Sequence, residues 1–226
     1  MKKILFLALS ALLFASLACN ATANLPHVDD QTATPDKVIY QDDFEDTSTG
    51  WASFTDADGI TDYDAGFYRI RVDTIGTDQN GMDMWSHPGQ DIDGDVRVEV
   101  DATKIGGPDD NDMGVLCRYT KTDDTFNFYY FLITSDGYVA IAKMKASHSE
   151  FISGKDMIAS SAIKKTSTNH IRADCIGKKL TLYVNDKQVA TATDDEFTGG
   201  DIGVLAGTFK EPGVDIHFDN LIVSRP

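Results

Sequence analysis

Residues 126–143, FNFYYFLITSDGYVAIAK, constrain the fold more than any other part of the chain. Asp136-Gly137 lies between two runs of aromatic and β-branched residues, and this dipeptide accepts the positive φ angles of a two-residue hairpin turn. The first run is apolar at successive positions, so a strand there has apolar side chains on both faces. Such a strand is typical of the centre of a sheet, with one face on the core and the other covered by loops or lining a groove.

The rest of the chain repeats short apolar segments separated by turn signals. Residues 66–73 and 95–103 alternate apolar and polar side chains, and Asn185-Asp186 marks a second hairpin between 179–184 and 187–192. Further strands are expected at 38–44, 80–87, 113–120, 169–176, 201–209 and 217–223, whereas 145–167 is less regular. Strands recurring about every eight to twelve residues indicate an all-β fold, an antiparallel β-sandwich. We predict that this sandwich domain spans residues 38–226.

The charge balance limits the classes of partner. The chain has 36 acidic and 20 basic residues, a net charge of −16. Such a surface repels phosphate backbones, so nucleic acid is not an expected partner. It also repels anionic headgroups, so a membrane is expected to hold the protein only through a lipid anchor. The acidic residues cluster in turns, among them Asp109, Asp110 and Asp112; they are either solvated or, in one or two clusters, bind calcium.

Residues 1–18 have the features of a signal peptide. A positive start, Met1-Lys2-Lys3, precedes an apolar run that ends at Ala18 and is too short to span a bilayer comfortably. Two cleavage interpretations stay open. Ala21-Thr22-Ala23 fits an ordinary signal peptidase, whereas residues 16–19, SLAC, resemble a bacterial lipobox with Ser16 and Leu17 departing from the usual pattern. Residues 19–37 then form the anchor cysteine and a polar tether that contains two prolines.

The cysteine count favours the lipoprotein interpretation. Three cysteines in an exported protein leave one unpaired. If Cys19 carries lipid, Cys117 and Cys175 remain as a pair in an oxidising compartment. We therefore expect an exported lipoprotein at the cell surface or in the periplasm.

Several segments together resemble one known group of proteins. They are QDDFED followed by Trp51, GVLCRY, FNFYYFLITSDGY, NHIRADCIGKKLTLYVNDKQV, GGDIGVLAG and FDNLIV. Their order and spacing over residues 40–224 resemble the concanavalin A-like lectin/glucanase superfamily. Within it, the chain is similar to bacterial exported domains related to laminin-G-like modules and to the 3-keto-disaccharide hydrolase domain.

The resemblance implies a jelly roll of two curved sheets whose concave face often holds carbohydrate. Paired cysteines at Cys117 and Cys175 are similar to a feature of the bacterial subgroup. The resemblance also implies a structural calcium site where the first and last strands pair. The available oxygen ligands there are Asp43, Glu45 and Asp219.

The sequence offers little for catalysis. Glycoside hydrolysis needs two carboxyl groups that flank the sugar. Glucanases of the superfamily carry Glu-x-Asp-x-x-Glu on one strand, and the nearest match, residues 99–104, ends in Lys104. The second carboxylate is therefore missing, and Glu99 is expected to belong to an outward polar row. No catalytic residue is predicted.

Sugar binding needs aromatic faces and a few polar groups that fix hydroxyls. The candidates are Trp51, Trp85, Arg118, Tyr129, Phe131 and Tyr183. Arg118 alternates with Cys117 and Tyr119, so it faces the groove if they face the core. We expect a lectin-like domain that binds a neutral or cationic glycan, such as a cell-surface polysaccharide, without cleaving it. Two alternatives stay open: a glycosidase or 3-keto-disaccharide hydrolase-like enzyme, and a structural or protein-interaction module of laminin-G type.

Overall fold

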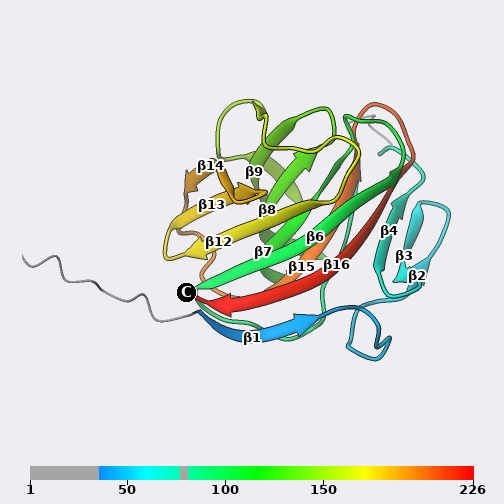
Figure 1. Cartoon of the computed structure of the whole chain (residues 1–226). Helices are drawn as coiled ribbons and strands as arrows, with labels where there is room; N and C mark the ends of the chain where they lie inside the picture. Colours follow the sequence, from blue (N-terminus) through cyan, green and yellow to red (C-terminus); the bar gives the residue numbers. More distant parts are fainter. Residues whose placement is uncertain (1–35, 77–80) are drawn as a thin grey trace, which may run out of the picture. The chain divides into compact units, whose positions relative to one another are not determined.

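Two antiparallel sheets pack face to face in the computed structural model, which describes residues 36–76 and 81–226 (Figure 1). The predicted signal peptide, Cys19 and most of the tether lie outside these residues. Within the described ranges, no helix has the length and apolar character needed to cross a bilayer. The predicted all-β sandwich is therefore confirmed.

One sheet has nine strands, in the order β14-β13-β12-β6-β16-β4-β3-β2, and β1 also pairs with β16. The strands are β1 (Lys37–Asp42), β2 (Phe54–Thr55), β3 (Gly59–Tyr63), β4 (Tyr68–Val72), β6 (Val96–Gly106), β12 (Asn169–Ile176), β13 (Lys179–Val184), β14 (Lys187–Thr193) and β16 (Val214–Arg225). The first and last strands thus lie side by side, with Lys37 opposite Arg225.

The other sheet has seven strands, in the order β10-β9-β8-β7-β15-β5, and β11 also pairs with β9. The strands are β5 (Met82–Ser86), β7 (Asp112–Thr122), β8 (Thr125–Thr134), β9 (Tyr138–Lys145), β10 (His148–Phe151), β11 (Ile158–Ala159) and β15 (Asp201–Thr208). Strand β8 is interior, as its two apolar faces predict. The short strands β10 and β11 lie in the segment expected to be irregular, where they pair with the outer edge of β9.

The two hairpin turns differ in length. Asn185 and Asp186 alone join β13 to β14, and both take left-handed φ angles of 49° and 66°, as expected for a two-residue turn. Three residues, 135–137, join β8 to β9, so the predicted two-residue turn there is wrong by one residue. Gly137 takes a φ of 104°, which a side chain would disfavour.

The core lies between the sheets, and a disulfide crosses it. Alternation along β8 turns Tyr129, Phe131 and Ile133 inward, where they join the main apolar cluster. Cys117 of β7 is bonded to Cys175 of β12, so the disulfide joins the two sheets and confirms the predicted pair. The closed loop spans 58 residues.

Candidate functional site

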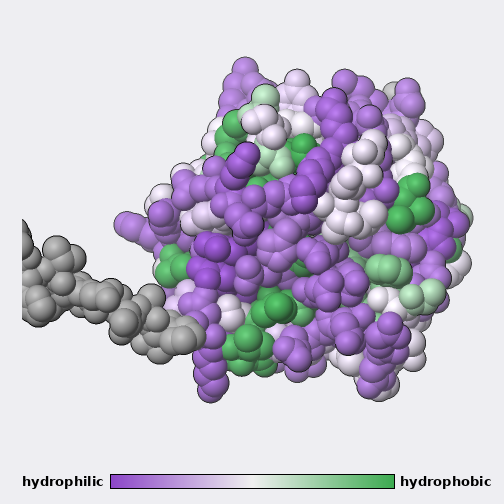
Figure 2. Space-filling view, viewed as in Figure 1, coloured by the Kyte–Doolittle hydropathy of each residue, from purple (hydrophilic) through white to green (hydrophobic). Residues whose placement is uncertain are grey.

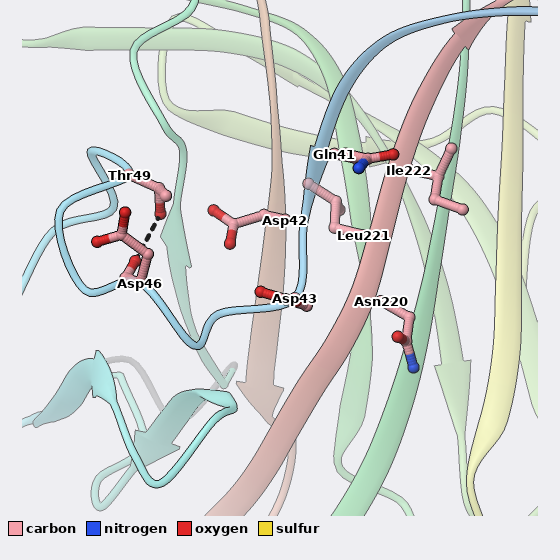
Figure 3. A pocket seen from close by; sticks show the side chains of 8 residues that line it. All are labelled: Gln41, Asp42, Asp43, Asp46, Thr49, Asn220, Leu221 and Ile222. Atoms are coloured by element: carbon pink, nitrogen blue, oxygen red, sulfur yellow. Dashed lines mark hydrogen bonds between the residues drawn. The ribbon is translucent and has the colours of Figure 1, made fainter.

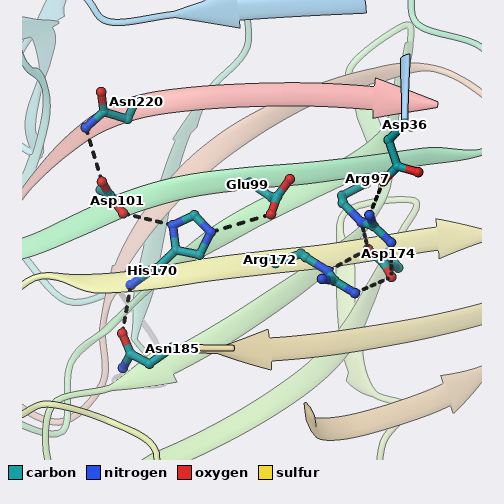
Figure 4. Close-up of polar contacts among 9 residues, drawn as sticks. All are labelled: Asp36, Arg97, Glu99, Asp101, His170, Arg172, Asp174, Asn185 and Asn220. Carbon is teal, nitrogen blue, oxygen red and sulfur yellow. Dashed lines mark hydrogen bonds and ion pairs between the residues drawn. The ribbon is translucent and has the colours of Figure 1, made fainter. Parts of the chain in front are cut away.

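The two sheets differ in the chemistry of their outer faces. The face of the nine-stranded sheet is covered by ion pairs, and Figure 2 shows that this side of the molecule is largely hydrophilic. On it, Arg97 donates to Asp174 at 2.7 Å, and Arg172 donates to the same carboxylate at 3.1 Å (Figure 4). The Arg172 guanidinium also lies 3.9 Å from the ring centroid of Tyr183. These charges satisfy one another, and Arg172 stacks on the aromatic ring.

His170 lies between two carboxylates on the same face (Figure 4). Its Nε2 is 3.5 Å from Glu99 Oε1, and its Nδ1 is 2.9 Å from Asp101 Oδ1. The interaction with Glu99, helped by Asp101 and opposed by partial burial, raises the pKa of His170 to about 9. The imidazole is therefore charged at neutral pH, and Glu99 is an ion-pair partner on a polar row.

The outer face of the seven-stranded sheet is apolar and aromatic. Its buried members are Leu116, Tyr119, Phe128, Tyr130, Leu132, Ala140, Ala142, Met144 and Leu205, and Trp85, Phe126 and Met157 pack against them. We call this cluster the aromatic face; its nine buried members are covered, and Trp85, Phe126 and Met157 at its margin are partly exposed. It is a second apolar cluster, separate from the core between the sheets, and hollows open at both ends of β7 and β8.

The hollow at one end, the tryptophan hollow, is lined by Trp85, His87, Tyr119 and Phe126 and has a volume of about 360 Å³. The rings of Trp85 and Phe126 meet edge to face with centroids 5.0 Å apart, and those of His87 and Tyr119 are 4.3 Å apart. Asp201 Oδ2 lies 2.8 Å from His87 Nδ1, which orients the imidazole. The arrangement offers aromatic surface beside an oriented polar group.

The hollow at the other end, the acidic hollow, has a volume of about 460 Å³. Its apolar walls are Leu132, Tyr138, Phe151, Met157 and Phe209. Four carboxylates also line it, those of Asp110, Asp112, Asp136 and Asp156, against one basic residue, Lys210. A ligand in this hollow meets apolar surface and negative charge together.

Asp112 also belongs to a close carboxylate pair. Gly207 of β15 pairs with Asp83 of β5 on one side and with Asp112 of β7 on the other. A Cβ atom on Gly207 would lie 2.1 Å from Asp83 Oδ1 and 2.8 Å from Asp112 Oδ1, so the two carboxylates meet above the glycine. Asp112 Oδ1 is enclosed and has no hydrogen-bond partner in the described part of the chain.

Burial controls the protonation of this pair. It raises the pKa of Asp83 to about 6. Burial, and then the charge of Asp83, raises the pKa of Asp112 well above the usual range of a carboxyl. Both carboxyl groups of the pair therefore hold a proton more strongly than an ordinary aspartate does.

Three of the aromatic residues predicted to bind ligand lie in the core. Trp51, Tyr129 and Phe131 are buried between the sheets, and Trp51 Nε1 donates to Asp42 Oδ2 at 2.9 Å. The prediction chose the wrong face of β8, because Phe128 and Tyr130 are the aromatic residues that point outward. Trp85 does lie on the aromatic face, whereas Tyr183 lies on the opposite sheet beneath Arg172.

Arg118 was also predicted on the wrong side of its sheet. A β-bulge shifts the register between Cys117 and Thr120, and Arg118 takes a φ of 57° within it. The bulge breaks the alternation, so Cys117 faces the core and Tyr119 the aromatic face. The guanidinium of Arg118 is buried and donates to the carbonyl oxygens of Phe197, Cys175 and Gly177 at 2.8, 3.2 and 2.9 Å. Its role is to hold chain segments together.

Of the three predicted calcium ligands, Asp43 alone lines the small hollow of about 300 Å³ between β1 and β16 (Figure 3). Burial raises the pKa of Asp219, and the charges of Asp101 and Asp43 add to this effect. Glu45 instead has its carboxylate beside Gly66. In residues 36–76 and 81–226, no group of three or more His, Cys, Asp or Glu side chains is arranged to hold a metal ion. The calcium site stays a prediction.

No protein-family model and no curated protein matches this chain. Solved structures do match. The carbohydrate-binding module CBM66 from Bacillus subtilis is 18% identical, covers 78% of this chain and 96% of its own, and superposes with a TM-score of 0.60. The β-glucanase of Bacillus licheniformis is 10% identical, covers 83% and 98%, and also has a TM-score of 0.60. The fold is a concanavalin A-like jelly roll.

A third jelly roll extends the range of neighbours. The κ-carrageenase of Pseudoalteromonas carrageenovora, in complex with an oligotetrasaccharide of κ-carrageenan, is 8% identical and has a TM-score of 0.57. It covers 87% of this chain and 98% of its own. At these low identities the similarity shows a shared jelly roll and nothing about individual site residues. The acidic hollow and the Asp83–Asp112 pair are therefore features observed in this chain. Sequence reasoning noted Asp112 as a member of an acidic turn but did not single out Asp83.

Proposed function

We propose that this protein binds a glycan on its aromatic face. The observation that carries the proposal is a pair of hollows with partly exposed aromatic side chains, one at each end of β7 and β8: Trp85 and Phe126 line one, and Tyr138, Phe151 and Phe209 line the other. Apolar ring faces suit the C–H surfaces of sugars. His87, the carboxylates of the acidic hollow and Lys121, whose Nζ lies 5.5 Å from the ring centroid of Phe126, are suited to hydroxyl groups. The fold neighbours, a carbohydrate-binding module and glucanases among them, support the same class of ligand.

We extend the proposal to location: an exported lipoprotein anchored through Cys19. The support is the leader sequence together with the Cys117–Cys175 disulfide, because such bonds persist in oxidising compartments.

A glycan array followed by calorimetry on the best ligand tests the binding function. Trp85→Ala removes a ring from the tryptophan hollow, and we expect affinity to fall by about 1–2 kcal/mol, or roughly 5- to 30-fold. Tyr183→Ala is the matched control, because Tyr183 is a half-buried aromatic residue on the opposite sheet. Equal losses in the two variants, or no binding to any glycan, would refute the proposal and favour a protein-interaction module.

The Asp83–Asp112 pair favours a second candidate, a glycoside hydrolase. Two close carboxyl groups with raised pKa values resemble the acid and the base or nucleophile of such an enzyme. The pair ranks second because the two carboxylates converge above Gly207 on one sheet, which leaves no room for a sugar between them. A reducing-sugar release assay distinguishes the two candidates. Turnover by the wild type that disappears in both Asp83→Asn and Asp112→Asn would support the hydrolase. Absence of turnover by the wild type would support glycan binding without hydrolysis.

A further inference from the structure

The acidic hollow differs from the rest of the aromatic face in carrying four carboxylates among exposed aromatic rings. We propose that it binds a protonated primary amine, so that the ligand of this protein is a glycan with free amino groups, such as a de-N-acetylated hexosamine polymer. This inference rests on the proposed glycan binding and specifies the class of sugar.

The walls of the acidic hollow are apolar side chains left open to solvent. Tyr138, Phe151 and Phe209 are 43%, 41% and 49% exposed, so their rings are accessible to a ligand. Apolar ring faces stack on sugar rings, and the same faces attract a cation. The Nζ atom of Lys210 lies 5.2 Å from the ring centroid of Phe209, its neighbour in the chain.

The carboxylates that line the hollow outnumber its basic residues. Lys210 is the one basic residue in its lining, and within the described residues it forms no ion pair with a carboxylate. Asp110 and Asp156 likewise make no side-chain hydrogen bond or ion pair there. Three of the four aspartates, those at 110, 136 and 156, therefore present a negative field that an external cation would complete.

An organic cation fits this hollow better than a metal ion. The carboxylates are spread around about 460 Å³, and the described residues contain no group of three or more side chains placed to hold a metal. A hexosamine unit fits within such a volume and brings an ammonium group with three donors. Asp112 also lines the hollow, but its Oδ1 is enclosed beside Asp83, so the accessible acceptors are the carboxylates of Asp110, Asp136 and Asp156.

The probes are a glucosamine tetramer and its fully N-acetylated counterpart, which have the same length and differ in the charge of the nitrogen. Calorimetry at pH 6, where the amines are protonated, should show the glucosamine tetramer binding at least ten times more tightly. The double variant Asp110→Asn/Asp156→Asn should weaken binding of the glucosamine tetramer at least fivefold. Phe151→Ala should weaken both tetramers, because it removes stacking surface.

The control is Asp186→Asn/Asp195→Asn, which removes the same charge from two exposed positions outside the hollow. It should bind both tetramers as the wild type does. Equal affinity for the two tetramers would overturn the amine inference but leave glycan binding intact. Equal weakening by the control would also overturn it, since the attraction would then come from net charge. If neither tetramer nor any array glycan binds, the proposed function itself fails.

Discussion

Asp83 and Asp112 face each other across Gly207, and no basic residue lies between their carboxylates. Two acids in register on strands that flank one glycine can meet only because glycine has no side chain. The arrangement is unfavourable when both acids are ionised, since each loses solvation and they repel each other. The pair therefore costs the folded state stability at neutral pH.

The first prediction concerns the stability of this pair. The pKa of Asp83 is about 6 in the folded protein and near 4 in the unfolded chain. The contribution of Asp83 to stability is therefore fully present below pH 4 and is lost as the pH rises through about 6. Asp83→Asn/Asp112→Asn should therefore be more stable than wild type at pH 7, by roughly 1–2 kcal/mol, and no more stable at pH 4. Urea denaturation at the two pH values measures this. A double variant that is less stable at pH 7 would show that the pair is a structural contact.

His170 gives a pH dependence in a higher range. Its pKa is raised to about 9, so its contribution to stability is complete below about 6.5 and is lost as the pH rises through 9. The side chain is 39% exposed, and solvent screening limits the effect to about 1 kcal/mol or less. The melting temperature of wild type should fall more between pH 7 and 9.5 than that of His170→Gln. His148→Gln, at an exposed position outside this network, should behave as wild type; identical slopes for all three proteins would contradict the prediction.

The disulfide should be the largest single contributor to stability. Closing a 58-residue loop corresponds to about 4 kcal/mol in the chain-entropy model, so Cys117→Ala/Cys175→Ala should lose stability on that scale. Cys19→Ser should lose none. Thiol counting on the exported protein under denaturing, non-reducing conditions should find neither Cys117 nor Cys175 free, and two free thiols would refute the bond in the cell.

Lipidation at Cys19 is tested by fractionation. One acyl chain binds a membrane only marginally, so lasting attachment requires several chains on that cysteine. Cys19→Ser should move the protein from the membrane to the soluble fraction. A soluble wild-type protein whose mature chain starts at Asn24 would instead establish ordinary cleavage after Ala23.

The calcium prediction is tested by heating. If Asp43, Glu45 and Asp219 hold calcium, the melting temperature should rise in millimolar calcium and fall in chelator, because a ligand that binds only the folded state stabilises it. Asp43→Asn should abolish the difference. The same melting temperature under both conditions would remove the site from consideration.

The positions of the main strands were predictable because alternation and turn residues are local signals. Val98 and Val100 alternate with polar neighbours, and Asn185-Asp186 fixes its turn through backbone preferences alone. The face of β8 that meets the core was not predictable, since Tyr129 and Tyr130 are equally suited to burial. The bulge at Arg118 was not predictable either, because the alternation of apolar and polar residues does not indicate where an extra residue interrupts a strand.

The candidate site was less accessible to sequence reasoning because it depends on topology. Asp83 and Asp112 belong to β5 and β7, and they become neighbours only when β15, from near the end of the chain, is placed between those strands. Neither aspartate is unusual in its own segment. Trp85 was identified because a single tryptophan in a strand is a local signal.

The pairing of Lys37 with Arg225 places the two ends of the sandwich next to each other, as Figure 1 shows for β1 and β16. A short peptide could therefore join them, and the chain could be opened at the exposed Asp186 turn without removing any strand pair. Such a circular permutant would carry its ends at the edge hairpin β13–β14. The jelly roll would be the same, and an anchor attached there would hold it at the β13–β14 hairpin instead of at β1.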